Sequence, residues 1–156
     1  NGVAFDAIEY YGFEMREINS YYSSLQLVNR FLTRNNNWRR DQYPTQLVFV
    51  PLALALKIKN DSLYEQFRSG KGEVILRDFA ANSYSTLGYA ERLVNEDRSN
   101  LSQEEMKEKA VDALIVEYKN IFASEGGGRR DENLQDFEEA TALIGSYTTI
   151  PAGDEE

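Results

Sequence analysis

Hydrophobic residues recur at three- and four-residue steps over most of the chain, which is the spacing of amphipathic helices. Clusters of Asn, Gly and Pro separate the periodic stretches and mark the connections between helices. The predicted helices, in chain order, are 13–33, 45–59 (or 51–59), 73–95 and 102–122, and a short segment over 62–68 continues the chain after the second of them. The pattern contains no convincing strand hairpin and no internal repeat. It predicts an all-α fold, arranged as an up-down-up-down four-helix bundle with mostly antiparallel neighbours.

The longest apolar run, Leu47 to Leu56, is ten residues long and contains Pro51. A membrane-spanning helix needs about twenty apolar residues, so this run is too short to cross a bilayer. Its composition predicts a buried core helix that is kinked at, or begins at, the proline.

Two of the predicted helices carry further local signals. Ser102 and Glu105 form a capping box at the start of the last long helix, with Leu101 and Met106 at the positions of a hydrophobic staple. The helix predicted over 73–95 is slim, so a neighbouring helix can approach it closely. Its small residues are Ala80, Ala81, Ser83, Ser85 and Gly88.

Both ends of the chain differ from the predicted bundle, which covers residues 13–124. Residues 1–12 form an apolar arm that is either a short helix or extended. Residues 125–156 hold nine acids and two bases, so most of the net charge of −9 lies there. We expect a flexible acidic appendage with a short helix, acting as a solvated tail or as a contact for a basic partner. The nearly neutral body argues against a general nucleic-acid binder.

The chain has no His and no Cys, which removes the usual proton shuttle, the thiolate nucleophile and the preferred zinc ligands. A di-iron helical bundle cannot be built without His, and the acids do not follow the EF-hand calcium pattern. Gly126–Arg130 lacks the Lys-Ser/Thr pair of a phosphate-binding loop. We therefore expect a protein that is not an enzyme and holds no metal or cofactor.

The segment 30–40 carries the only Trp among four Arg and no acid. Arg and aromatic residues are enriched at binding hot spots, so the segment suggests a docking surface for an acidic partner. The proposed partner-binding residues are Arg30, Arg34, Trp38, Arg39, Arg40 and Tyr43. Two alternatives stay open: Trp38 caps the bundle while the arginines pair with its own acids, or Trp38 stacks on single-stranded RNA.

The order of these features resembles the PsbQ-like extrinsic subunits of photosystem II. The matching pieces are Arg30–Trp38, Glu73–Val94 with its Leu76–Arg77 pair, and Lys109–Ser124. The acidic end and the proline-containing apolar run depart from the family pattern and suggest a divergent algal or diatom-type member. The resemblance implies a non-enzymatic subunit, monomeric when free, that binds the photosystem II core and other extrinsic subunits in the chloroplast thylakoid lumen. It would stabilise the oxygen-evolving centre and its chloride and calcium retention, without inserting into the membrane.

The alternative hypothesis is an exported bacterial helical domain that binds other proteins in the periplasm and is unrelated to photosynthesis. The chain starts at Asn1, so either a targeting peptide has been removed, which we favour, or the sequence has been trimmed. The unprocessed precursor separates the two hypotheses. A bipartite plastid and thylakoid presequence favours the first, and a simple export signal favours the second.

Overall fold

The computed structural model describes residues 2–34, 45–123, 138–139 and 141–142. Over these residues the chain forms seven α-helices, one π-helical turn and no strand, which confirms the all-α class. The elements are α1 (Gly2–Tyr11), α2 (Met15–Arg34), the π-turn η2 (Thr45–Phe49), α3 (Val50–Lys59), α4 (Asp61–Arg68), α5 (Glu73–Ala81), α6 (Tyr84–Glu91) and α7 (Gln103–Phe122). The expected four-helix arrangement is not confirmed.

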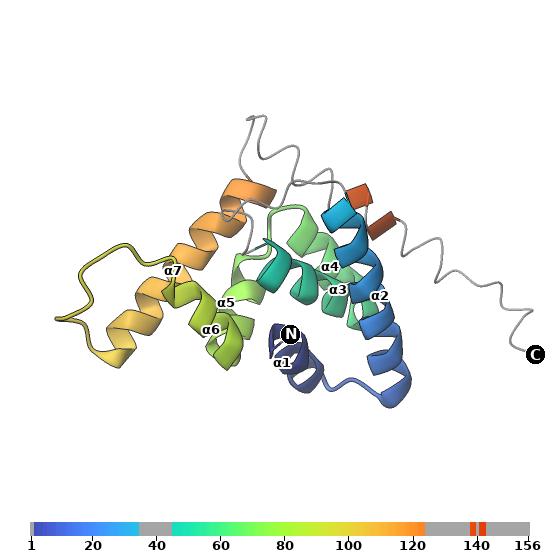
Figure 1. The fold of residues 1–156 in the computed structure, drawn as a ribbon, viewed down its shortest axis with the longest axis horizontal. Helices are drawn as coiled ribbons and strands as arrows, with labels where there is room; N and C mark the ends of the chain where they lie inside the picture. Colours follow the sequence, from blue (N-terminus) through green and yellow to red (C-terminus); the bar gives the residue numbers. More distant parts are fainter. Residues whose placement is uncertain (1, 35–44, 124–137, 140, 143–156) are drawn as a thin grey trace, which may run out of the picture.

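The two longest helices lie at opposite ends of the described structure, with the shorter helices between them (Figure 1). Helix α2 forms one end and α7 the other. Helix α1 lies beneath the centre and packs against both α3 and α6. Helices α5 and α6 connect the centre to α7, which both of them contact.

Helix α3 is the centre of the hydrophobic core. Every residue from Val50 to Leu56 is buried, and α1, α2, α4 and η2 all contact this helix. Fully burying one large aliphatic side chain contributes about 1.5–3 kcal/mol, so this run makes a substantial contribution to the apolar stabilisation. The predicted buried helix is confirmed. The wider π-turn η2 ends at Phe49, two residues before Pro51, whose ring and missing N–H disfavour a regular helical turn on its N-terminal side.

A buried hydroxyl joins α2 to α3. The Tyr21 Oη donates a hydrogen bond to the Pro51 carbonyl at 2.6 Å. Burial raises the pKa of the Tyr21 phenol above its ordinary value, so the hydroxyl remains a donor at neutral pH. Tyr21, Ser24, Leu25 and Val28 are buried along α2, and the three hydrophobic ones follow the spacing that predicted this helix.

Two glycines end helices by the same backbone geometry. Gly12 and Gly70 have positive φ values of 63° and 86°, which only glycine adopts without strain. After α4, the Lys71 N–H donates to the Gln66 carbonyl at 2.9 Å and the Gly70 N–H to the Phe67 carbonyl at 3.2 Å. This pair of bonds is the Schellman motif, and α1 ends in the same way. The predicted breaks at both glycines are confirmed.

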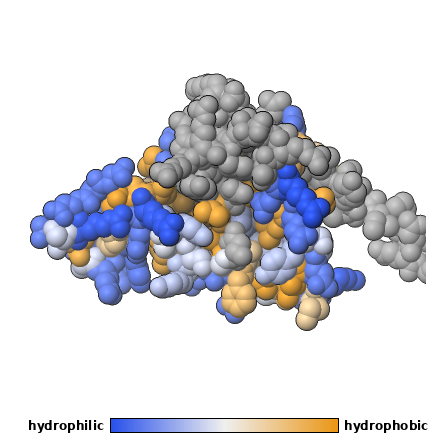
Figure 2. Space-filling view, in the orientation of Figure 1, coloured by the Kyte–Doolittle hydropathy of each residue, from blue (hydrophilic) through white to orange (hydrophobic). Residues whose placement is uncertain are grey.

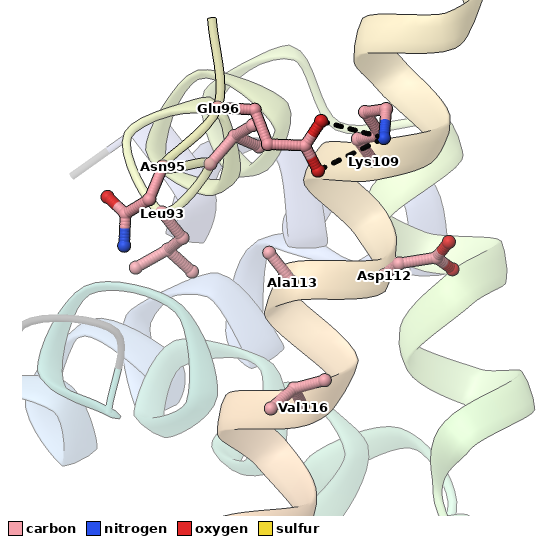
Figure 3. A pocket seen from close by; sticks show the side chains of 8 residues that line it. Leu93, Asn95, Glu96, Lys109, Asp112, Ala113 and Val116 are labelled. Carbon is pink, nitrogen blue, oxygen red and sulfur yellow. Dashed lines mark hydrogen bonds and ion pairs between the residues drawn. The ribbon is translucent and has the colours of Figure 1, made fainter.

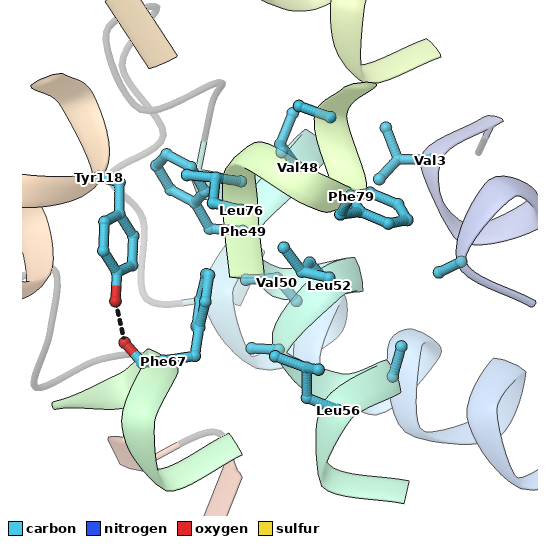
Figure 4. Packing of buried hydrophobic residues seen from close by; sticks show 14 of the residues in the cluster. Val3, Val48, Phe49, Val50, Leu52, Leu56, Phe67, Leu76, Phe79 and Tyr118 are labelled. Atoms are coloured by element: carbon cyan, nitrogen blue, oxygen red, sulfur yellow. Dashed lines mark hydrogen bonds between the residues drawn. The ribbon is translucent and has the colours of Figure 1, made fainter. Parts of the chain in front are cut away.

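Helix α7 joins the core through one aromatic residue. The Tyr118 Oη donates to the Phe67 carbonyl (Figure 4). It also accepts from the Gly72 N–H at 2.9 Å. Burial raises the pKa of Tyr118 to about 12, so its proton stays in place. Its ring packs against Phe67 and against Phe122, which stacks on it at 5.1 Å. This contact ties α7 to the end of α4 and the start of α5.

The prediction of one helix over residues 73–95 is wrong, because the chain breaks at Asn82–Ser83 into α5 and α6. Ser83 leaves the helical conformation and accepts a hydrogen bond from the Thr86 N–H at 3.2 Å, which caps α6. Asp6 of α1 completes the cap, since its Oδ2 lies 2.7 Å from Ser83 Oγ and accepts from the Ser85 N–H at 3.2 Å. A carboxylate at the start of a helix also interacts favourably with the positive end of the helix dipole.

The predicted helix 102–122 is confirmed as α7. The Ser102 side chain accepts from the Glu105 N–H at 3.1 Å, and the Glu105 carboxylate accepts from the Ser102 N–H at 3.5 Å. This is the capping box read from the sequence.

The two ends of the chain differ in how far the structure describes them. The N-terminal arm, left open as helix or extended, is the helix α1, and its Val3, Ala4 and Ala7 belong to the core. The acidic appendage 125–156 lies outside the described residues apart from 138–139 and 141–142. Within those, Glu138 pairs with Arg68 of α4 at 2.8 Å and Thr141 is buried.

We expect Gly72→Ala to destabilise the fold by about 1–3 kcal/mol, as overpacking of a full core does. A Cβ at this position would lie 2.8 Å from Tyr118 Oη and 2.9 Å from Phe67 Cα. The matched control is Gly88→Ala on α6, where a Cβ meets nothing within 4 Å. There the change should stabilise by about 0.4–1 kcal/mol. Urea unfolding measures both, and equal effects would contradict the Tyr118 contact.

Candidate binding site between helix α7 and the end of helix α6

The chain that follows α6 forms one wall of the site. The N–H groups of Arg92, Leu93 and Val94 donate to carbonyls three residues earlier, which continues the helix as tighter turns. The Arg98 guanidinium then donates to the carbonyls of Glu91 at 2.6 Å and Val94 at 3.1 Å. A cation on the last carbonyls is a favourable helix ending, and it fixes this wall.

The next residues lead from this wall to α7 through a short turn held by its own side chains. Asp97 Oδ1 accepts from the Ser99 N–H at 3.0 Å and from the Ser99 hydroxyl at 2.7 Å. These two bonds lower the pKa of Asp97, so it is ionised at neutral pH. The Leu101 N–H donates to the Arg98 carbonyl at 3.2 Å, just before the Ser102 cap of α7. The wall and the helix are therefore joined by a well-bonded connection.

A hollow of about 370 Å³ lies between this wall and α7 (Figure 3). Its apolar residues come from both sides, and Val116 of α7 is 57% exposed. The residues that line it are Leu93, Val94, Asn95, Glu96, Lys109, Asp112, Ala113 and Val116. In Figure 3, Leu93 and Ala113 face each other across the hollow.

An ion pair bridges the two walls at one end of the hollow. The Lys109 Nζ lies 3.1 Å from Glu96 Oε1 and 3.0 Å from Oε2. This contact raises the pKa of Lys109, so the ammonium stays charged. Both side chains are more than one-third exposed, so the pair orients the walls more than it stabilises them.

A second set of charges fixes α7 against α5. Asp112 points away from the hollow and accepts from Arg77 Nη1 at 3.0 Å (Figure 3). Arg77 also pairs with Glu73 at 3.1 Å, and Lys119 reaches Glu73 at 2.6 Å. Lys119 and Arg77 lower the pKa of Glu73, while Asp112 and Glu73 raise the pKa of Arg77. The Leu76–Arg77 pair thus has a packing role, with Leu76 buried and Arg77 joining two helices.

The site offers an open apolar floor beside a fixed pair of opposite charges. Such a combination suits binding, since apolar surface gives affinity and placed charges give orientation. Among the described residues, no group of three or more carboxylates gathers where it could hold a metal ion. No described helix is both long enough and apolar enough to cross a membrane.

Of the residues predicted as partner-binding, only Arg30 has a described side chain, and it does not line this hollow. Arg30 is exposed on α2, and α2 and α7 lie at opposite ends of the described structure (Figure 1). Arg34 is the last residue of α2, and its side chain lies outside the described residues. Trp38, Arg39, Arg40 and Tyr43 also lie outside them. The proposed Arg-rich docking surface therefore stays a prediction.

Sequence reasoning missed the hollow because its walls meet only in the folded chain. Glu96 and Lys109 are thirteen residues apart and on either side of a turn, so no helical spacing relates them. The available signal was weak: Val116 is an apolar residue outside the core-facing pattern of α7.

The chain was compared with protein-family models, curated proteins and solved structures, and none of them matches it.

Two carboxylates near this end of the molecule should respond to pH in opposite ways. Glu117 is half-buried on α7, and burial raises its pKa above the ordinary 4.5, whereas cations lower the pKa of Glu73. The ionised Glu117 therefore costs stability at neutral pH, and this cost disappears as pH falls below its unfolded pKa. The Glu73 contribution is present above its unfolded pKa and is lost as pH falls through its folded pKa.

We expect Glu117→Gln to raise the free energy of unfolding at pH 7 and Glu73→Gln to lower it. Both differences from the original chain should shrink toward zero at acidic pH, where carboxyl groups are protonated in folded and unfolded states alike. Urea unfolding across pH 3–8 measures them. Differences of the same sign, or a Glu117→Gln difference that persists at pH 3, would contradict these assignments.

Proposed function

We propose that this chain is a non-enzymatic protein-binding domain whose hollow between α6 and α7 receives an apolar side chain of a partner. The observation that carries this proposal is the apolar floor, open at Val116, held beside the Glu96–Lys109 ion pair. Covering apolar surface contributes about 25 cal/mol per Å², so the hollow favours an apolar occupant. The ion pair at its end favours a partner that offers a charged or polar group next to that side chain.

The partner proposed from the sequence resemblance is photosystem II. On this proposal the chain is an extrinsic subunit at the lumenal face of the chloroplast thylakoid that stabilises the oxygen-evolving centre and its chloride and calcium retention. The four helices of the family bundle would correspond to α2, the continuous η2–α3, the pair α5–α6, and α7. The motif pieces within Arg30–Trp38, Glu73–Val94 and Lys109–Ser124 support it.

The second candidate is an exported bacterial domain that binds other proteins in the periplasm. The hollow supports this candidate equally well, because an apolar floor with one ion pair does not define the partner. The two candidates differ in whether the chain binds photosystem II membranes.

The test uses two valines with matched exposure. Val116 lines the hollow and is 57% exposed, while Val74 of α5 is 69% exposed and does not line it. We expect Val116→Gln to weaken rebinding to salt-washed photosystem II membranes by roughly tenfold, which corresponds to about 1.4 kcal/mol. Val74→Gln should leave rebinding unchanged. Both variants should keep the helical melt, since Gln is at least as good a helix former as Val.

Each outcome bears on a different part of the proposal. If the original chain does not bind the membranes, the photosystem assignment is wrong and the result favours the bacterial candidate. If the chain binds and the two variants behave alike, the hollow is not the contact.

A further inference from the structure

A second surface, separate from the hollow, lies on α1 and α2. Large hydrophobic side chains are exposed there, with Phe5 55% and Met15 73% exposed. Tyr10 and Tyr22 are exposed as well. We call these four residues the α1–α2 surface. Figure 2 shows hydrophobic colour along the lower edge of the molecule, over α1 and the start of α2.

The two tyrosines of this surface are held by rings behind them. Tyr10 packs edge-on against Tyr11 at 4.9 Å and against the buried Phe79 at 5.7 Å. Tyr22 lies 6.0 Å from the buried Tyr21, which in turn contacts Phe13 at 5.1 Å. A ring that is already packed against other rings loses little conformational entropy when a partner covers it. Such pre-ordered aromatic side chains are typical of binding hot spots.

The charges around the α1–α2 surface are mainly negative. Its ionised side chains over residues 2–23 are Asp6, Glu9, Glu14, Arg16 and Glu17. Glu17 pairs with Lys59 at 2.9 Å, and Asp6 caps α6. The carboxylates of Glu9 and Glu14 have no partner among the described residues, so they are free to meet a cation.

We propose that the α1–α2 surface binds a cationic amphipathic helix of a partner protein. The apolar face of such a helix would cover Phe5 and Met15, while its Lys or Arg residues would meet Glu9 and Glu14. Cations also bind favourably over the faces of Tyr rings. Anionic lipid headgroups would be repelled by the same carboxylates, so the charge favours a basic protein segment over a membrane surface. This inference goes beyond the proposed function and does not depend on the hollow.

The test uses the full chain and two synthetic peptides of the same helical pattern. One peptide carries Leu along one face of a helix, at three- and four-residue steps, and Lys along the other face. Its control has Glu in place of every Lys. We expect the Leu/Lys peptide to bind with amide shift changes that map to α1 and α2 by NMR. Binding should weaken as salt rises, and the Leu/Glu peptide should bind at least tenfold more weakly.

Variants separate this surface from the rest of the molecule. Phe5→Gln with Met15→Gln, and Glu9→Lys with Glu14→Lys, should each weaken binding of the Leu/Lys peptide at least tenfold. Val74→Gln and Val116→Gln, which lie elsewhere, should not. Circular dichroism melts check that each variant remains folded. Since Val116→Gln is neutral here, failure of the hollow and failure of this surface are distinguishable.

Several results would overturn the proposal. These are shift changes that map away from α1 and α2, equal binding of the two peptides, or equal weakening by Val74→Gln. Binding to phosphatidylglycerol vesicles that the Phe5→Gln/Met15→Gln variant loses would assign the surface to a membrane instead. A dimer detected by light scattering and lost in that variant would assign it to a second copy of the chain.

Discussion

The burial of α3 on every side is the constraint on which the other helices depend. A helix with no polar face cannot lie at the surface of a small bundle, because it would expose one apolar side to water. Helices α1, α2 and α4 and the turn η2 all contact it. Of these neighbours only α2 is long, and the short helices α1 and α4 complete the cover. The apolar run from Val50 to Leu56 thus requires neighbours on several sides, and α1 and α4 supply part of them.

Two buried tyrosine hydroxyls give this core a defined geometry. Apolar packing alone tolerates sliding between helices, whereas a buried hydroxyl must find its carbonyl. Tyr21 sets α2 against α3, and Tyr118 sets α7 against α4 and the start of α5. The Tyr118 contact also helps to determine the shape of the hollow, because it positions α7, which forms one of the walls. Arg77 adds a further link between α5 and α7 on the exposed side.

Locally encoded features could be predicted from the sequence, and features made by distant residues could not. The start of α7 is encoded by Ser102 and Glu105 within one turn, and the buried α3 by its own composition. The break between α5 and α6 was missed because the periodicity continues across it, and the cap at Ser83 is completed by Asp6 from α1. The hollow was missed for the same reason, since Glu96 and Lys109 meet only after the turn folds. The predicted Arg-rich docking segment lies largely outside the described residues.

The contact between Asp6 and the start of α6 has a consequence for the order of folding. It joins residues 79 positions apart, so the chain must close a long loop before the contact can form. During synthesis α1 emerges before α3 and α6, so Val3, Ala4 and Ala7 reach their native packing only after both of those helices have been made. The contact between Asp6 and the start of α6 is therefore expected to form later than the contacts between neighbouring helices of this span.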